Sequence, residues 1–193
     1  MKRVTTFRAV TVILFRHAYV VPQESPLEIQ RVDENRLLDA REMESSSMIG
    51  TFRGFLARGD WGYYAYLDQR VRHRSWVQFG PRRVDLWQGF VPRELREQEA
   101  LIHFCETSSA ARGHGIYTAV LRRIVNDLKA RSIQSIWIST TADNAASRRG
   151  IEKAGFLEHR RIALRVVFGW PFARILPASD DRIPESYDAR TES

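Results

Sequence analysis

The pattern of apolar and polar positions is most regular between Ala100 and Phe156. The apolar run Ala100–Thr107 predicts a strand. From Ile116 to Leu128, apolar residues recur at every fourth position, the spacing of a helix with one buried face. A second apolar run, Ser135–Thr140, predicts another strand, and a second helix follows it. The middle of the chain therefore predicts the order strand, helix, strand, helix.

The N-terminal segment predicts one or two strands and one helix. The β-branched and aromatic residues of Val4–Val21 predict the strands, with the stronger pattern at Val10–Phe15, and the turn-forming residues at Pro22–Pro26 predict a loop. A helix is expected over Arg31–Met43, with Leu37 and Leu38 facing inward.

The next segment predicts a capped helix and a β-hairpin. Ser45-Ser46-Ser47 provides the cap for a helix at Met48–Ala57. The aromatic-rich runs Trp61–Leu67 and Val71–Phe79 predict the two strands of the hairpin. The run Val84–Val91 fits either a strand or a substrate-facing loop.

The remaining segments predict one turn, one or two further strands and a tail. Pro92–Glu99 is polar, and an exposed surface turn is the favoured interpretation. Arg161–Phe168 alternates as a strand does, and Trp170–Leu176 fits a last strand or a flap. We expect a single domain at residues 1–176 and a polar, flexible tail at 177–193.

Composition and charge narrow the class of protein. The chain has 193 residues, of which 44% are hydrophobic and 11% aromatic, as in an ordinary globular domain. The net charge of +7 fits nucleic acid, an acidic membrane surface or an anionic cofactor as a partner. The arginines are scattered and no aromatic and basic platform stands out, which argues against nucleic acid.

No segment predicts export or membrane insertion. The apolar run near the N-terminus is interrupted by Arg8 and Arg16, and no signal cleavage site follows it. No run reaches the ~18 apolar residues that a membrane span requires. The single cysteine, Cys105, excludes an intrachain disulfide. We therefore expect a soluble protein in a reducing, cytoplasmic compartment.

Two glycines just before the helix at Ile116 predict a phosphate site. Gly113 and Gly115 let the backbone turn tightly and let a ligand approach closely. The first N–H groups of a helix have no partner within it and, with the helix dipole, attract anions. By itself this motif also fits an ordinary tight turn.

A second motif, 31 residues beyond Gly113 (144 − 113 = 31), makes the first more specific. Asn144 has the character of a helix N-cap, and Gly155 that of the left-handed residue after a helix end. The order strand, Arg-Gly-x-Gly, helix, strand, Asn-x-x-Ser, helix, Glu-Lys-x-Gly-Phe resembles the GNAT superfamily of acyl-CoA N-acyltransferases. The resemblance covers roughly Trp61 to Phe168 and is strongest over Glu106–Phe156.

The resemblance implies a fold and a cosubstrate. The fold would be α/β, a central mixed sheet of about six to seven strands flanked by helices, with two middle strands that splay apart. Acetyl-CoA or another acyl-CoA would be the cosubstrate, and no metal is expected. Because CoA is polyanionic, part of the positive charge would serve it. Homodimers are common in the superfamily, so a homodimer is one option.

The family's pyrophosphate loop, Gln/Arg-x-x-Gly-x-Gly/Ala, can be placed on the chain with Ala110 at its first position, a departure from the pattern. The expected CoA-binding residues are those of this loop, of the helix start, of the central strand and of the second motif: Cys105, Thr107, Arg112, Gly113, His114, Gly115, Ile116, Tyr117, Asn144 and Ser147. A tyrosine that often protonates the leaving thiolate in the family falls on Ile151, so the usual general acid is absent.

The catalytic candidates are Glu106, His103 and Ser147. Strict alternation along the central strand would place Leu101, His103, Cys105 and Thr107 on one face, and Ile102, Phe104 and Glu106 on the other. Glu106 and His103, as alternative general bases, would then point to opposite faces, and Glu106 is preferred. Ser147, Tyr117 or water would donate the proton to the thiolate.

Three functions remain open on the sequence. The preferred one is transfer of an acetyl or other acyl group from acyl-CoA to a primary amine of a small molecule, in a ternary complex. The second is acylation of protein lysine or N-terminal amines. The third is a CoA-binding module that has lost catalysis along with the acid at Ile151.

Overall fold

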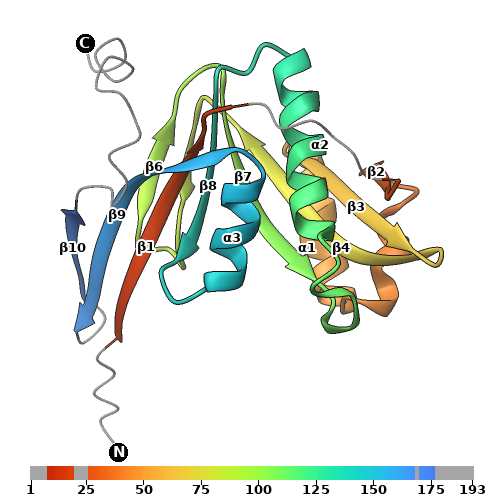
Figure 1. Cartoon of the computed structure of the whole chain (residues 1–193), viewed down its shortest axis with the longest axis horizontal. Coiled ribbons are helices and arrows are strands. Elements are labelled where there is room, and N and C mark those ends of the chain that lie inside the picture. The colour runs from red at the N-terminus through yellow and green to blue at the C-terminus, as the bar shows by residue number, and fades with distance from the viewer. Residues whose placement is uncertain (1–7, 20–25, 168–169, 177–193) are drawn as a thin grey trace, which may run out of the picture.

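The computed structural model describes residues 8–19, 26–167 and 170–176. Eight strands form one sheet: β1 (Arg8–His17), β2 (Glu28–Val32), β3 (Trp61–Leu67), β4 (Arg70–Phe79), β7 (Glu99–Thr107), β8 (Ser135–Thr141), β9 (Phe156–Val167) and β10 (Trp170–Leu176). Their order in the sheet is β10-β9-β1-β8-β7-β4-β3-β2 (Figure 1). The pair β7 and β8 is parallel, and the other paired strands of this sheet are antiparallel.

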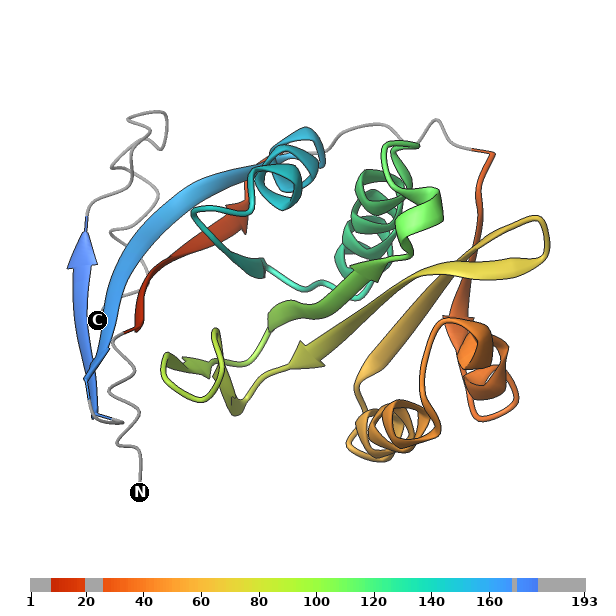
Figure 2. The ribbon, with the colours of Figure 1, turned by 90° about the horizontal axis from the view of Figure 1, so that it is seen from below.

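Helices cover both faces of the sheet (Figure 2). One face carries α2 (Ile116–Ala130) and α3 (Ala145–Lys153), preceded by a 3-10 turn, η2 (Ser109–Ala111). The opposite face carries α1 (Ser46–Ala57) and the 3-10 helix η1 (Leu37–Glu42). A small hairpin of β5 (Arg82–Asp85) and β6 (Pro92–Leu95) lies on that same face, nearer to β8 and β1. The sheet is therefore the middle layer of three.

Each layer contact has its own apolar core. The face under α2 and α3 packs the helical stripe predicted from the sequence, including Val120, Ile124 and Leu128, against Ile102 and Ile138. Below the hairpin the buried residues belong to the other face of the same strands, such as Leu101 and Trp137. A third core, built on the aromatic side chains of α1, β3 and β4, lies under α1.

Most of the predicted elements are confirmed, and with them the mixed α/β class. The strand at Val10–Phe15 lies within β1, and the hairpin is β3 and β4. Ser45 is the N-cap of α1, and its side chain accepts a hydrogen bond from the backbone N–H of Met48 at 3.2 Å. Residues 22–25 of the predicted loop, Phe168, and the tail at 177–193 lie outside the described residues.

Three predictions are wrong in detail. The helix expected at Arg31–Met43 is replaced by the end of β2 and by η1, and Leu38 is exposed whereas Leu37 is buried. Pairing of β2 with β3 outweighs the local helical pattern at Arg31 and Val32, and this edge strand helps to bring the sheet to eight strands rather than about six to seven. The turn expected over Pro92–Glu99 contains β6, because Leu95 is buried against the sheet.

The N-terminal strand β1 fills a place in the sheet that its sequence position does not suggest. It lies between β8 and β9 and pairs antiparallel with both, for example Leu14 with Ser139 and with Arg160. Its residues Val12–Phe15 are at most 2% exposed. The strand therefore supports the outer side of β8, which leaves the inner side of β8 to face β7.

Among the helices of the described residues, none is both long enough and apolar enough to span a bilayer.

Candidate active site

The site is built where the two parallel strands part. Strands β7 and β8 pair over only four positions, from Glu99 with Ser135 to Ile102 with Ile138. Beyond this point β7 runs on to Thr107 paired with β4 alone, and β8 runs on paired with β1 alone. The predicted parting of the middle strands is confirmed. It leaves backbone N–H and C=O groups of two strands facing the space between them.

A β-bulge lies on β7 just after the strands part. His103 pairs with Trp76 and Glu106 with Arg74, so two residues of β7 stand opposite one residue of β4. The extra residue is accommodated at Phe104, whose φ is +54°. The bulge turns this stretch of backbone out of the regular ladder.

The bulge reverses the predicted facing of the side chains that follow it. Cys105 packs against the core under α2, together with Ile102 rather than with Leu101. The rings of His103 and Phe104 both contact Phe55 of α1, at centroid distances of 5.2 Å and 5.4 Å. The expectation that His103 shares a face with Cys105 and Thr107 is therefore wrong, because strict alternation fails at a bulge.

The start of α2 presents the expected anion-binding geometry. Gly113 and Gly115 have φ values of +84° and +72°, which glycine adopts without strain. A Cβ atom added at either glycine would meet no atom within 4 Å, so the space in front of the loop is open. No side chain caps α2, and its first turn holds no acidic residue. The first N–H groups of α2 thus remain available to a ligand.

The other predicted loop residues surround this helix end. Arg112 is exposed, and its Nε donates to the carbonyl of Thr107 at 3.3 Å. The His114 ring contacts the carbonyl of Arg112 through Nδ1 at 3.0 Å. The side chain of Ile116 is buried, so only its backbone N–H faces the loop. These contacts hold the loop against the end of β7.

Asn144 caps α3 as predicted. Its Oδ1 accepts a hydrogen bond from the backbone N–H of Ser147 at 3.0 Å. Gly155, which follows the helix, has a φ of +92°. The cap holds Ser147 in the first turn of α3, where its hydroxyl lies 3.4 Å from the hydroxyl of Tyr117.

Tyr117 joins the helix start to the bulged strand. Burial raises the pKa of Tyr117 well above its ordinary value, and the neighbouring Cys105 raises it further. Burial also raises the pKa of Cys105, to about 11, against the opposing effect of a hydrogen bond with Ser75. Both groups are therefore protonated at neutral pH, so a Cys105 nucleophile is disfavoured.

Two polar residues of β4, His73 and Ser75, lie beside this cluster and were not predicted from the sequence. His73 is fully buried, and its ring nitrogens contact Thr107 Oγ1 and Ser75 Oγ, each at 2.7 Å. Its ring also lies 5.6 Å from that of Tyr117. The available signal was the polar stretch Arg72-His73-Arg74-Ser75, which lies between the apolar residues Val71 and Trp76.

On the opposite face, Glu106 belongs to an ion-pair network. Arg74 Nη2 donates to Glu106 Oε2 at 2.7 Å, while Arg74 Nε donates to Glu44 and Nη1 to the carbonyl of Phe104. The side chain of Glu106 is 52% exposed, whereas those of Arg74 and Glu44 are 6% and 8% exposed. Glu106 therefore presents a carboxylate to solvent from a position fixed by a buried arginine.

His103 lies on the same face as Glu106 and has a different environment. Its Nε2 is buried and has no hydrogen-bond partner among the described residues. Burial lowers the pKa of His103 to about 3, and the charges of Arg58, Arg82 and Arg74 add to the effect. The ring is therefore neutral at physiological pH. Glu106 is the better placed of the two to accept a proton.

Comparison with known families identifies the class of the domain. Residues 62–156 match the acetyltransferase (GNAT) family model, and this stretch contains the parted strands, the glycine loop and both motif helices. The chain therefore carries a GNAT-family acetyltransferase domain. No curated protein sequence is similar enough to the chain to count as a match.

Solved structures share the fold at low sequence identity. A GNAT-family acetyltransferase of Colwellia psychrerythraea superposes with a TM-score of 0.60 at 15% identity, over 83% of this chain and 56% of that one. A GNAT-family protein of Novosphingobium aromaticivorans gives 0.59 at 18% identity, over 90% and 66%. The chain thus spans between half and two thirds of the length of these two relatives.

A third structure is covered more fully by the alignment. The aminoglycoside antibiotic 6'-N-acetyltransferase of Acinetobacter haemolyticus superposes with a TM-score of 0.51 at 19% identity, over 68% of this chain and 91% of that one. At such identities the likeness concerns the fold alone, and the substrates of this chain have to be argued from its own residues.

Proposed function

We propose that the protein transfers an acetyl or other acyl group from acyl-CoA to a primary amine of a small molecule, by direct transfer in a ternary complex. The observation that carries this proposal is the meeting of three features at one place. Strands β7 and β8 part after Ile102 and Ile138, a bulge follows on β7, and the uncapped start of α2 lies beside its end.

The residues around this place suit an acyl-CoA. A pyrophosphate would bind to the first N–H groups of α2 and to Gly113–Gly115, with the charge of Arg112 nearby. The pantetheine arm would pair with the backbone groups of β7 near Cys105 and Thr107. Asn144, Ser147 and Tyr117 would line its other side. The open space in front of both glycines supports this fit, because a phosphate has to approach the backbone closely.

Transfer requires a polarised carbonyl, a neutral amine and a proton for the departing sulfur. A backbone N–H at the bulge of β7 would polarise the carbonyl. Glu106 would take the proton of the amine, directly or through water, because it is the half-exposed carboxylate of this region. The neutral ring of His103 would line the acceptor side rather than act as the base.

Two of the predicted residues, Tyr117 and Ser147, carry a hydroxyl that is a candidate to donate the proton to the thiolate. Ile151 is fully buried in the core under α2, so the usual tyrosine position contributes nothing. The hydroxyl of Tyr117 lies beside Cys105 on the parted strand and 3.4 Å from Ser147 Oγ. We assign Tyr117 as the proton donor and Ser147 as the residue that positions its hydroxyl.

The amine acceptor would approach from the face that carries α1. Phe104 is 40% exposed there, and its ring packs on the buried rings of Phe52 and Phe55. Glu106 adds a negative charge at its border. An apolar or sugar-like amine that is cationic in solution matches this combination.

The deciding experiment is a panel of amines offered with acetyl-CoA, with free thiol release as the readout and mass spectrometry of the products. The panel should contain amino sugars, amino acids, polyamines and peptides with free N-terminal or lysine amines. Turnover of small amines supports the proposal, whereas turnover of peptides alone assigns the protein-acylating function instead. Stabilisation by CoA without turnover of any amine would identify a binding module, and absence of CoA binding would refute all three.

A further inference from the structure

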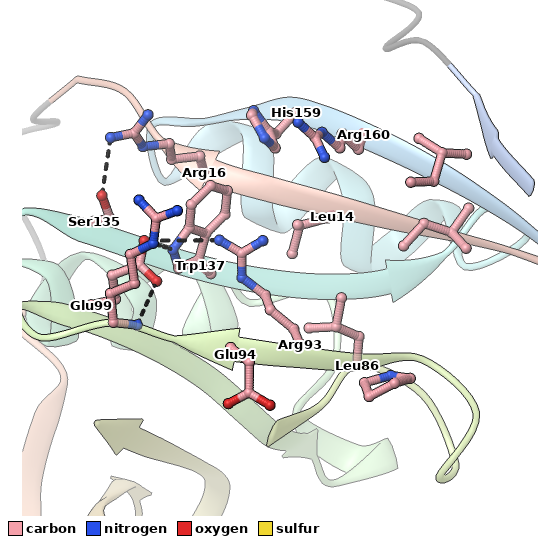
Figure 3. Close-up of a pocket in the computed structure, with 14 residues that line it drawn as sticks. Leu14, Arg16, Leu86, Arg93, Glu94, Glu99, Ser135, Trp137, His159 and Arg160 are labelled. Carbon is pink, nitrogen blue, oxygen red and sulfur yellow. Dashed lines mark hydrogen bonds and ion pairs between the residues drawn. The ribbon is translucent and has the colours of Figure 1, made fainter. Parts of the chain in front are cut away.

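A cavity of about 390 Å³ lies away from the proposed active site, between the β5–β6 hairpin and the strands β1, β8 and β9 (Figure 3). Neither the glycine loop at Gly113–Gly115 nor Glu106 contributes to its walls. One wall is the β5–β6 hairpin, which lies on the same face of the sheet as α1 and on the opposite face from α2.

Positive charge dominates the walls of this cavity. Four arginines line it: Arg16 from β1, Arg93 from β6, Arg96 just after β6, and Arg160 from β9. Two carboxylates, Glu94 and Glu99, line it as well. The side chain of Glu94 is 71% exposed, and its carboxylate lies 3.9 Å from Arg83, which is not among the lining residues. Among the described residues that line the cavity, Glu99 is therefore the carboxylate that lies closest to the guanidinium groups.

Glu99 is already engaged by neutral donors as well as by one arginine. Its carboxylate accepts the backbone N–H of Arg96 at 3.0 Å and the indole N–H of Trp137 at 3.3 Å. It lies 3.8 Å from Arg93 Nη2. Its single negative charge is thus shared among three donors.

Arg93 stands at the centre of the cluster. Its guanidinium stacks on the Trp137 ring at 3.9 Å, and its Nε is buried without a hydrogen-bond partner among the described residues. Burial lowers the pKa of Arg93, the charge of Glu99 opposes this, and the charges of Arg160, Arg96 and Arg16 lower it further. The Arg93 side chain is 23% exposed, and a partly buried guanidinium with like charges around it is stabilised by an anion that joins the cluster.

We propose that this cavity is a binding site for a small multivalent anion, whose phosphate or carboxylate groups are held by Arg93, Arg16 and Arg160. The site is independent of the acyl-CoA site and does not require the proposed transferase activity. Arginine suits both kinds of group because its planar fork binds two oxygens at once. The stacking on Trp137 fixes one of these forks in advance, which lowers the entropy lost on binding.

The test is a calorimetric titration of the full chain with two probes, inorganic pyrophosphate for the phosphate arm and citrate for the carboxylate arm. Binding of either probe to the unaltered protein is expected. In Arg93→Gln its affinity should fall about tenfold or more, because one charged partner of the anion is lost. Arg53→Gln removes an arginine with a side chain 58% exposed on α1 and serves as the matched control with unchanged affinity.

Arg16→Gln provides a second variant in case Arg93→Gln folds poorly, since Arg16 donates to Ser135 Oγ at 3.0 Å from the opposite wall. The affinity for the bound probe should also fall as salt is raised. Failure of both probes to bind, or equal affinity in the wild type and the folded Arg93 and Arg16 variants, would overturn the proposal. The second result would place the probe elsewhere, for example at the start of α2.

Discussion

The ring of Tyr117 lies directly against Gly150, so that a Cβ atom at Gly150 would stand 2.7 Å from Cδ1 of Tyr117. This contact joins the first turn of α2 to the last turns of α3. The backbone carbonyl of Gly150 also accepts a hydrogen bond from the hydroxyl of Thr118 at 3.3 Å. The absence of a side chain at position 150 therefore allows α3 to approach α2 closely enough for Ser147 to reach Tyr117.

Gly150→Ala should destabilise the protein although alanine is the better helix former. The added methyl group needs the Tyr117 ring to move, and overpacking of this kind costs about 1–3 kcal/mol. Urea unfolding followed by circular dichroism measures the change. In a Tyr117→Ala background Gly150→Ala should cost less stability than in the wild type, because the clashing ring is gone.

Gly50→Ala is the matched control for this prediction. Gly50 is a helical glycine of α1, and a Cβ atom there would meet nothing within 4 Å. The same substitution should therefore stabilise the protein by about 0.5–1 kcal/mol. Equal effects at positions 50 and 150 would contradict the contact between Tyr117 and Gly150.

Gly115→Ala should lower both the stability of the protein and its affinity for CoA, and the loss of affinity is the specific effect. A non-glycine residue at its φ of +72° is strained by about 1–2 kcal/mol, and relief of the strain would shift the first N–H groups of α2. Gly59→Ala is a suitable control because Gly59 has a φ of +80° and equally open space. Calorimetry should show reduced CoA affinity for Gly115→Ala only, and equal losses of affinity in both variants would rule out a specific role for the loop.

Acidification should destabilise the protein between pH 6.5 and pH 3 through His73. Burial, together with the charge of Arg74, lowers its pKa from 6.5 to about 3. Between these two pKa values His73 is protonated in the unfolded chain and neutral in the folded chain. The free energy of unfolding therefore decreases as the pH falls. Between pH 7 and pH 5 this residue alone accounts for a loss of about 2 kcal/mol.

Urea unfolding at pH 7 and pH 5 tests this prediction. His73→Gln should be less stable at pH 7 and should show a smaller loss on acidification than the wild type. His114→Gln, at an exposed position, should keep the wild-type pH dependence. An unchanged pH dependence in His73→Gln would exclude His73 as its source.

The sequence predicted the elements that depend on local chemistry. Ser45, Asn144 and the four-residue apolar repeat from Ile116 each act through neighbours a few positions away, and the structure confirms them. The helix predicted at Arg31–Met43 is wrong at its start because Arg31 and Val32 pair with β3, and the later part of the segment forms the 3-10 helix η1. The place of β1 between β8 and β9 is likewise a long-range choice that no local pattern encodes.

The bulge at Phe104 places His103 and Glu106 on the same face of the sheet, whereas strict alternation along β7 predicts opposite faces. One extra residue reverses the alternation, and nothing in the run from Leu101 to Thr107 marks it. The family pattern Gln/Arg-x-x-Gly-x-Gly/Ala also fits with Arg112 first, which supplies the basic residue that Ala110 lacks. In that placement Tyr117 occupies the last position of the pattern, where the family has a small residue. Room for its ring is provided by Gly150 of α3, which has no side chain.

Tyr117→Phe should lower turnover while it leaves CoA binding and stability close to those of the wild type. The ring and its packing against Gly150 remain, and only the hydroxyl near Ser147 is lost. Loss of a general acid lowers the rate by about 10²–10⁴-fold. Ser147→Ala should have a smaller effect, because it removes the positioning contact alone. Full activity of Tyr117→Phe with the best amine of the panel would leave water as the proton donor.

Glu106→Gln, on the face of the sheet that carries α1, should lower turnover strongly and stability only slightly. The Glu106 carboxylate is 52% exposed, so its ion pair with Arg74 contributes no more than about 1 kcal/mol. As the proposed base, however, it should govern turnover, which is expected to fall about 10²-fold or more at neutral pH.

Glu44→Ala gives the contrasting result that makes this test specific. Glu44 pairs with the same arginine but is 8% exposed, and its removal leaves the buried Arg74 short of a partner. We expect a loss of about 3 kcal/mol in stability. Folded Glu44→Ala should retain most of its turnover as long as Glu106 stays in place. If Glu106→Gln kept wild-type turnover and pH dependence, the base would have to be sought elsewhere, and the ion pair with Arg74 would be structural.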